Sequence, residues 1–406
     1  MGQSLPKHPN KPIDRSDNDR KNEEIIFPDE ENVILDHNDK LEQYYVAYST
    51  ITFQIKDLTK YEIDEQVFQQ CEMQRGIRHY FKMQNILENF DGDEIFIKVI
   101  NFSQEILSKD DINEEKMRIM KVNKRLVKEA IILESCKARF ITQPLGYFNN
   151  RAHQSIYLIF EFVNRRLHDL FTDVSLGPFL NKMRLFKNLI DIVLYLHLSG
   201  IVSYDISPYS IGVIGKQNAA KLLTFGNSIK FTGEAIDVLR ESWFDREKFD
   251  FFTSPELYLN KTILLRYCWS ADIWSLGVLA YIMFRKDYAS FYYKLDNEFI
   301  DKETSLYTDE GGFVASEFYQ VFDMSKIENP FIKSLIISML RLEFTERPTI
   351  FEVADNFNKI CRFLELEEEY EVVYKKGDVL EFTKIFDHHT YELIVDDKDK
   401  PIVNSH

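Results

Sequence analysis

The hydrophobic pattern of this chain changes from strand-like to helical near residue 164. Before that point, short runs such as "EIFIKVINF" and "SIYLIFEFV" are rich in β-branched and aromatic residues, which is typical of strands. One segment among them, "LVKEAIILESC", fits a helix. After that point, "LFKNLIDIVLYLH" and "NPFIKSLIISMLRL" carry apolar residues at helical spacing. The order predicts an α+β fold with a small strand-rich lobe, a connector near residues 162–168 and a larger, mainly helical lobe.

The composition is that of a folded, acidic protein. Of the 406 residues 45% are apolar, and 33 Phe and 21 Tyr argue against wholesale disorder. The formal net charge of −16 argues against nucleic acid and anionic membranes as main partners, because both attract Lys and Arg. The longest largely apolar run, residues 273–284, is too short for a transmembrane segment and predicts a buried helix.

The cysteines suggest neither a metal site nor a disulfide framework. They are far apart and show no metal-binding spacing with each other or with histidine. We therefore expect no metal and four reduced thiols in an intracellular, cytoplasmic protein, with association with the cytoskeleton or a membrane left open. The four are Cys71, Cys136, Cys268 and Cys361.

The pattern also suggests where the folded body begins and ends. Residues 1–44 are polar and acidic and predict a flexible tail. Residues 45–366 form the expected domain, divided into lobes of about 45–163 and 164–366, with a charged insertion at about 103–124. Residues 367–406 are a C-terminal extension, in which Lys376 and Gly377 suggest the turn of a hairpin.

Three motifs in the helical lobe carry a family resemblance. "TSPEL" (253–257), "DIWSLG" (272–277) and "ERPT" (346–349) resemble, in order and spacing, the A-P-E, D-x-W-S-x-G and late arginine motifs of eukaryotic protein kinases. The resemblance covers about residues 60–365 and implies a bilobal kinase-like fold. It implies that Glu256 and Arg347 form a buried ion pair and that Asp272 is architectural. Such a pair is costly to break from one side, because its partner stays charged and buried.

The small lobe supplies two further matches. "IFIKVI" resembles the V-A-I-K strand, which implies that Lys98 contacts phosphate. A solvated strand lysine is the alternative, although the neighbouring side chains are apolar. "KEAIIL" implies Glu129 as the partner of Lys98, with Glu134 as the other choice.

The match to the catalytic loop is incomplete. "VSYDISPYS" resembles H-R-D-L-x-x-x-N, and Asp205 takes the place of the catalytic aspartate. Ser203 replaces the histidine, Tyr204 the arginine and Ser210 the metal-binding asparagine. Ser207 stands where many kinases have a lysine. Tyr204 cannot form the charge-assisted contact with an activation-loop phosphate that the arginine makes.

The metal-binding D-F-G motif has lost its aspartate. In "LLTFGN", Thr224 stands in its place, while Phe225 and Gly226 remain as structural residues. Magnesium requires hard oxygen ligands and usually binds carboxylate, so neither Thr224 nor Ser210 replaces the lost ligand well. The resemblance therefore argues against magnesium, and Asp205 becomes a vestigial base position that forms local hydrogen bonds.

The nucleotide site is also altered. The segment that replaces the glycine-rich loop, "QCEMQRGIRHYF", has one glycine, so backbone N–H groups are not expected to approach phosphate closely. The bulky Phe160, at the gatekeeper position, narrows the back of the site. No cofactor is expected, and ATP binding is left open. Should nucleotide bind, the resemblance implies contacts from Lys98, Glu129, Gly76, Phe160, Glu161 and Val163.

These losses, beside intact architectural motifs, predict a pseudokinase that binds proteins as a scaffold or allosteric regulator. Its partners would be proteins, for example a kinase or an assembly, and not nucleic acid. One alternative is an atypical active Ser/Thr kinase that binds ATP through Lys98 and uses Asp205 as base. The other is a structural component of a larger assembly, which the sequence does not separate from a scaffold.

Overall fold

The computed structural model describes part of the chain, and every structural statement below concerns that part. It comprises residues 79–82, 94–101, 129, 132–133, 136–150, 155–161, 163, 165–172, 176–214, 219–232, 235–237, 251–258, 263–264, 267–297, 321–387, 392–394 and 402–404. The predicted tail (1–44), Gly76 and the charged insertion lie outside it.

The small lobe contains a four-stranded antiparallel sheet, as the strand-like pattern predicts. Its strands in spatial order are β1 (His79–Lys82), β2 (Glu94–Asn101), β4 (Ser155–Glu161) and β3 (Pro144–Asn150). Lys98 lies in β2 opposite Leu158 of the central pairing β2–β4. Leu158, Ile159 and Phe160 are all buried, which explains why β4 reads as a nearly continuous apolar run.

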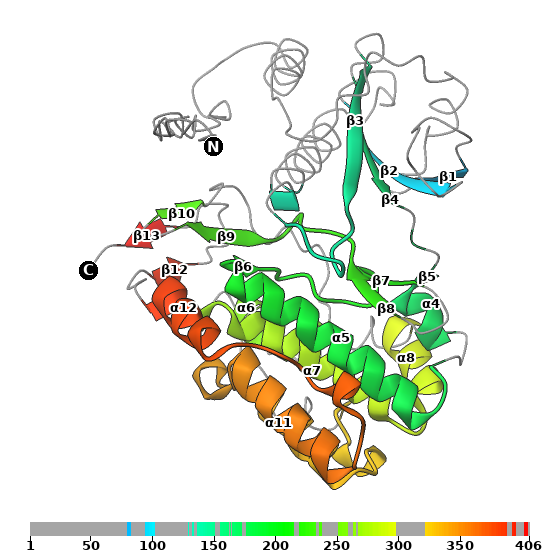
Figure 1. Ribbon diagram of the computed structural model, residues 1–406, viewed down its shortest axis with the longest axis vertical. Coiled ribbons are helices and arrows are strands. Elements are labelled where there is room, and N and C mark those ends of the chain that lie inside the picture. Colours follow the sequence, from blue (N-terminus) through cyan, green and yellow to red (C-terminus); the bar gives the residue numbers. More distant parts are fainter. Residues whose placement is uncertain are drawn as a thin grey trace, which may run out of the picture. The chain divides into compact units, whose positions relative to one another are not determined.

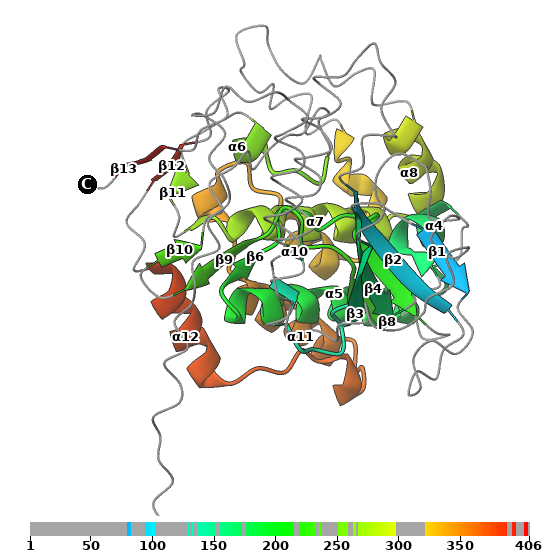
Figure 2. The ribbon, with the colours of Figure 1, turned by 90° about the horizontal axis from the view of Figure 1, so that it is seen from above.

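Four helices make the core of the large lobe (Figures 1 and 2). They are α5 (Phe179–Leu198), α7 (Ser270–Phe284), α10 (Pro330–Met339) and α11 (Ile350–Phe363). Helix α7 packs against α5 and α10, and α11 packs against the same two helices. Every residue of α7 is buried, as its apolar run predicts. Among the described residues, none of the helices combines the length and hydropathy needed to cross a membrane.

Shorter helices surround this core. They are α4 (Leu167–Thr172), α6 (Pro255–Tyr258) and α8 (Tyr288–Asn297), with 3₁₀ turns at Met324–Lys326, Phe344–Glu346 and Glu368–Tyr370.

Two small sheets hold the loops that the sequence singles out. One sheet contains β5 (Arg165–Arg166), β7 (Ile211–Ile214) and β8 (Ala219–Leu222). The other contains β6 (Ile201–Val202), β9 (Ile229–Thr232) and β10 (Ala235–Asp237). Residues 203–210 connect β6 to β7, and residues 223–228 connect β8 to β9. The candidate catalytic loop and the T-F-G segment therefore each run from one sheet to the other (Figure 1).

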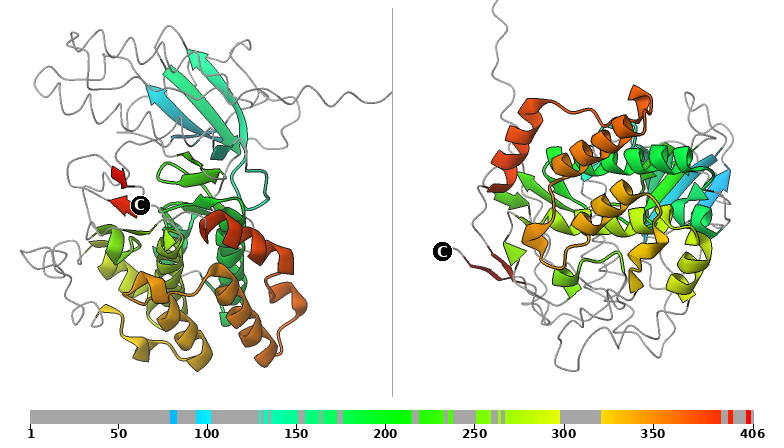
Figure 3. Two further views of the ribbon diagram at one scale, coloured as in Figure 1. Left: turned by 90° about the vertical axis from the view of Figure 1, so that its left-hand side faces the viewer. Right: turned by 90° about the horizontal axis from the view of Figure 1, so that it is seen from below.

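The predicted hairpin at Lys376–Gly377 is wrong, because this segment begins a helix, α12 (Lys376–Asp387). The Asp378 carboxylate accepts the backbone N–H of Lys375 at 2.7 Å, as the third helical residue does in a capping box. Phe382 and Phe386, one turn apart, are buried and pack on each other. Their side chains fix α12 on the large lobe, where it lies alongside α5 (Figure 3).

Strands β11 (Ile263–Leu264), β12 (Glu392–Ile394) and β13 (Ile402–Asn404) form a third small sheet. Through β11, which is the next described segment after α6, this sheet joins the last part of the chain to the large lobe.

The packing of α12 predicts a large effect of truncating Phe386. This side chain is 0% exposed and contacts Phe231 and His197, so Phe386→Ala should lower the free energy of unfolding. We expect a loss of about 3–5 kcal/mol in urea denaturation, the usual range for Phe→Ala in a core. Leu380→Ala, at a 59% exposed position of the same helix, is the matched control and should change little. Equal effects of the two changes would show that α12 is not packed as described.

Candidate active site

The buried carboxylate of Asp272 binds the backbone at the start of the candidate catalytic loop, residues 203–210. This carboxylate accepts the backbone N–H groups of Ser203 and Tyr204, both at 2.8 Å. The imidazole Nε2 of His197, at the end of α5, lies 3.2 Å from the same carboxylate. All four residues are buried, so these contacts replace the hydration that the carboxylate loses. Asp272 at the start of α7 thus determines where the loop begins.

Tyr204 has a backbone conformation that few residues adopt. Its φ is 54°, in the left-handed region that non-glycine residues seldom adopt. The chain therefore turns sharply between Ser203 and Asp205. The side chain is 2% exposed, and its hydroxyl interacts with the thiol of Cys268. Burial raises the pKa of Tyr204 well above its ordinary value. The ring is part of the core and presents no polar group to a phosphate at the surface.

Asp205 is half-buried and its backbone is tied to the same loop. Its N–H donates a long hydrogen bond, 3.4 Å, to the hydroxyl of Ser203. Ser203, which replaces the family histidine, is fully buried, and its carbonyl accepts the hydroxyl of Ser228. The residue that hydrogen-bonds the Asp205 backbone is thus small, uncharged and buried.

Ser207 and Ser210 bond to each other. The N–H of Ser207 donates to the Ser210 hydroxyl at 2.8 Å, and that hydroxyl donates to the Ser207 carbonyl at 3.1 Å. The N–H of Ser210 reaches the Ser207 hydroxyl at 3.3 Å. Both residues are buried, with Ser210 only 1% exposed. The two hydroxyls therefore close the turn and are not directed to an outside ligand.

The T-F-G segment retains its structural part. Phe225 is fully buried, and its backbone N–H donates to the carboxylate of Glu129 at 2.9 Å. Glu129, in the small-lobe segment that the sequence predicts to be helical, is itself 1% exposed. Thr224 is half-buried, and its hydroxyl accepts a long hydrogen bond, 3.5 Å, from the N–H of Gly226.

The residues present do not fit a magnesium ion. The two positions at which the family holds the metal carry hydroxyls, and that of Ser210 is committed to the turn. Asp205 is then the one carboxylate of the three matched positions. Across the residues that the structure describes, no group of three His, Cys, Asp or Glu side chains could hold a metal ion. Magnesium keeps few protein ligands, but it needs carboxylate among them to compensate its charge.

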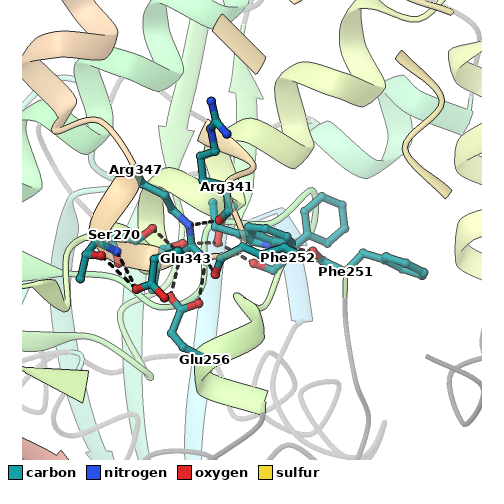
Figure 4. Close-up of polar contacts among 12 residues, drawn as sticks. Phe251, Phe252, Glu256, Ser270, Arg341, Glu343 and Arg347 are labelled. Atoms are coloured by element: carbon teal, nitrogen blue, oxygen red, sulfur yellow. Dashed lines mark hydrogen bonds and ion pairs between the residues drawn. The ribbon is translucent and has the colours of Figure 1, made fainter. Parts of the chain in front are cut away.

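The ion pair between Glu256 and Arg347 is present and buried (Figure 4). Two parallel hydrogen bonds, of 2.7 and 2.8 Å, join the guanidinium to the carboxylate. Arg347 also donates to the carbonyls of Ser270 and Arg341, and it lies over the ring of Trp274. Because the guanidinium also bonds backbone carbonyls on both sides of the pair, it fixes α6 and the start of α7 to the turn before α11.

Phe160, Glu161 and Val163 lie at the expected hinge between the two lobes, and their side chains contact other parts of the protein. Phe160 is 1% exposed and Val163 is 5% exposed. The carboxylate of Glu161 accepts the N–H of Gln143 at 2.8 Å and the ammonium of Lys221 at 2.5 Å. Lys98 is placed in β2 by its backbone, and Gly76 lies outside the described residues.

Comparison with known proteins agrees with this arrangement. A family model described as the protein kinase domain matches residues 91–357, more than half of the chain. The chain belongs to the protein kinase family. A probable myosin light chain kinase of Dictyostelium discoideum is 27% identical over 252 residues, which are 61% of this chain and 56% of that protein. CBL-interacting protein kinase 21 of Oryza sativa subsp. japonica is 27% identical over 176 residues, which are 42% of this chain and 31% of that protein. The chain thus matches about half of the first relative and a third of the second.

Within this kinase domain, sequence reasoning missed three contributors to the site. His197 is buried, and its contact with Asp272 joins residues 75 positions apart in the sequence. Lys221 and Gln143, which bond Glu161, were not singled out. Their partners are distant in sequence and come together only in the fold, so no local signal identifies them.

Removal of one partner of the buried ion pair should strongly destabilise this kinase domain. Arg347→Ala leaves Glu256 charged in the core and should lower the free energy of unfolding by about 3–5 kcal/mol in chemical denaturation. Lys286→Ala is the control, because its ion pair with Glu328 is exposed on both sides and should contribute almost nothing. A small loss for Arg347→Ala would contradict the architectural role of the pair.

Proposed function

We propose that this chain is a pseudokinase, in which phosphotransfer is lost or severely impaired and which acts by binding proteins, as a scaffold or an allosteric regulator. The observation that carries the proposal is the closed pair of Ser207 and Ser210. The residue at the metal-binding asparagine position is engaged by its own loop.

Phosphoryl transfer relies on charge compensation, which this loop does not supply. The transition state spreads negative charge over the transferred group, and metal ions normally neutralise it. With Thr224 and Ser210 uncharged, Asp205 alone would have to hold the metal and also orient the acceptor hydroxyl. A carboxylate that binds a metal ion is a weaker base, because the nearby positive charge favours its ionised form.

The retained architectural contacts of the kinase fold support the protein-binding part of the proposal. The anchors that maintain the shape of the loop and the large lobe, Asp272 and the pair of Glu256 and Arg347, are fully bonded. The chain therefore retains the framework that presents the surface of a kinase domain. Proteins are the partner class that fits an acidic chain of net charge −16 better than nucleic acid.

An atypical active Ser/Thr kinase is the second candidate. It is favoured by Glu129, which remains buried beside the Phe225 backbone, by Asp205 at the base position, and by relatives that are named as kinases. In this reading Lys98 would contact ATP. A structural component of a larger assembly differs from a scaffold only in the permanence of its contacts.

A phosphotransfer assay separates the first two candidates. The full chain would be incubated with radiolabelled ATP, with magnesium or manganese, and with itself and generic basic and acidic protein substrates. The proposal predicts incorporation no higher than that of the Asp205→Asn variant, which retains the side-chain size and removes the base. Incorporation that depends on metal and that Asp205→Asn abolishes would contradict it and establish the atypical kinase.

A further inference from the structure

Helix α12 packs on segments of the large lobe that lead into the candidate catalytic loop. Phe386 is fully buried and contacts Phe231 of β9, with 5.1 Å between the ring centroids. Phe382, one turn earlier, contacts Trp269, directly before α7, at 5.8 Å and Phe351 of α11 at 5.4 Å. The family model ends at residue 357, so α12 lies beyond the matched kinase domain. The helix is therefore an addition to that domain, attached to several of its elements.

The same two aromatic rings form part of the cover of His197, near the end of α5. The ring centroid of His197 lies 6.1 Å from that of Phe382 and 6.3 Å from that of Phe386. His197 is fully buried, and its Nδ1 has no hydrogen-bond partner among the described residues. A buried polar atom without a partner has lost its hydration without compensation. Release of α12 would return water to this nitrogen, so the release costs less free energy than it would from a wholly apolar contact.

His197 connects α12 to the start of the loop. Its Nε2 lies 3.2 Å from the carboxylate of Asp272, and the same carboxylate accepts the N–H groups of Ser203 and Tyr204 at 2.8 Å. The imidazole is thus held between the aromatic rings of α12 and the carboxylate that positions the loop. A change in the packing of α12 therefore acts on that carboxylate.

A second connection runs through the backbone between α5 and β6. The Cγ2 of Ile385 in α12 would lie 3.5 Å from a Cβ atom added to Gly200, which is an ordinary van der Waals distance. The carbonyl of Gly200 accepts the N–H of Phe231 at 2.7 Å, and Phe386 packs on the ring of Phe231. Strand β6 begins at the next residue, Ile201, and leads directly into the loop. Side chains of α12 thus lie against both partners of this hydrogen bond.

We propose that α12 is a C-terminal clamp on the candidate catalytic loop. While it is docked, it keeps water from His197 and fixes Asp272 together with the N–H groups of Ser203 and Tyr204. When it is released, these contacts open more often. This inference goes beyond the proposed function, because it gives the C-terminal extension a regulatory role that does not depend on whether phosphate is transferred.

Hydrogen–deuterium exchange of the full chain tests the clamp, because local opening controls the exchange of each backbone N–H. Thr383→Pro is the variant that releases α12. Position 383 is exposed and lies inside the helix, so proline removes a backbone donor and clashes with the carbonyl of Val379 without removing a core side chain. Thr383→Ala is the matched control at the same position, since alanine retains the helix.

We expect Thr383→Pro to raise the exchange rate in α12 by about 100-fold, which corresponds to the usual cost of an interior proline. In peptides that cover residues 199–206 we expect a rise of about tenfold or more. Residues 155–161 of β4 are the internal reference and should exchange as in the unchanged chain. Thr383→Ala should alter none of the three segments. Faster exchange in α12 with an unchanged loop, or an equal rise in β4, would overturn the clamp.

Phe382→Ala tests the same contact without a change that breaks the helix backbone. It removes the ring that packs on His197 and Trp269, so the loop should again exchange faster while β4 does not. Leu380→Ala, at a 59% exposed position of the same helix, is the control and should leave the loop unchanged.

The outcomes separate this inference from the proposed function. Phosphate transfer by the full chain would contradict the pseudokinase proposal and leave the clamp intact. An unchanged loop in Phe382→Ala and Thr383→Pro would overturn the clamp and leave the pseudokinase proposal intact.

Discussion

The structure around the candidate site depends on one carboxylate. Asp272 lies at the start of a helix that is buried on every side, and it holds two consecutive backbone N–H groups of the candidate catalytic loop. A buried carboxylate must find such donors or lose its charge. Here the loop supplies two and His197 a third nitrogen. Tyr204, the second of these two donors, has a left-handed backbone conformation with a φ of 54°.

The contacts that determine the shape of this loop do not involve the family's metal-binding side chains. The contacts that fix its path come from α7 and from Ser207 and Ser210 within the loop. None of them needs a metal or a phosphate. The ion pair between Glu256 and Arg347 does not need them either. It joins two parts of the large lobe that are far apart in the sequence. The family's architecture can therefore persist after its metal-binding side chains have changed.

The fold could be predicted from the sequence where local pattern and motif order agree. The apolar run at 273–284 predicts the buried α7, and "TSPEL" with "ERPT" predicts the pair of Glu256 and Arg347. The C-terminal helix was missed because Lys376 and Gly377 suggest a turn, while the signals for a helix are the cap by Asp378 and the spacing of Phe382 and Phe386. The closure of Ser207 on Ser210 could not be predicted, because a small hydroxyl can turn to any neighbour. The contact of Lys221 with Glu161 depends on how the two lobes meet.

Electron paramagnetic resonance of Mn²⁺ shows whether the altered catalytic loop holds a metal ion, since Mn²⁺ accepts the same oxygen ligands as Mg²⁺. The free-ion signal would be recorded with the full chain and with its Asp205→Asn variant, with and without ATP. If Asp205 and its neighbours hold no metal ion, both proteins should give the same signal, because weak binding to an acidic surface is common to the two. A bound ion that requires ATP and that is lost in Asp205→Asn would contradict this expectation.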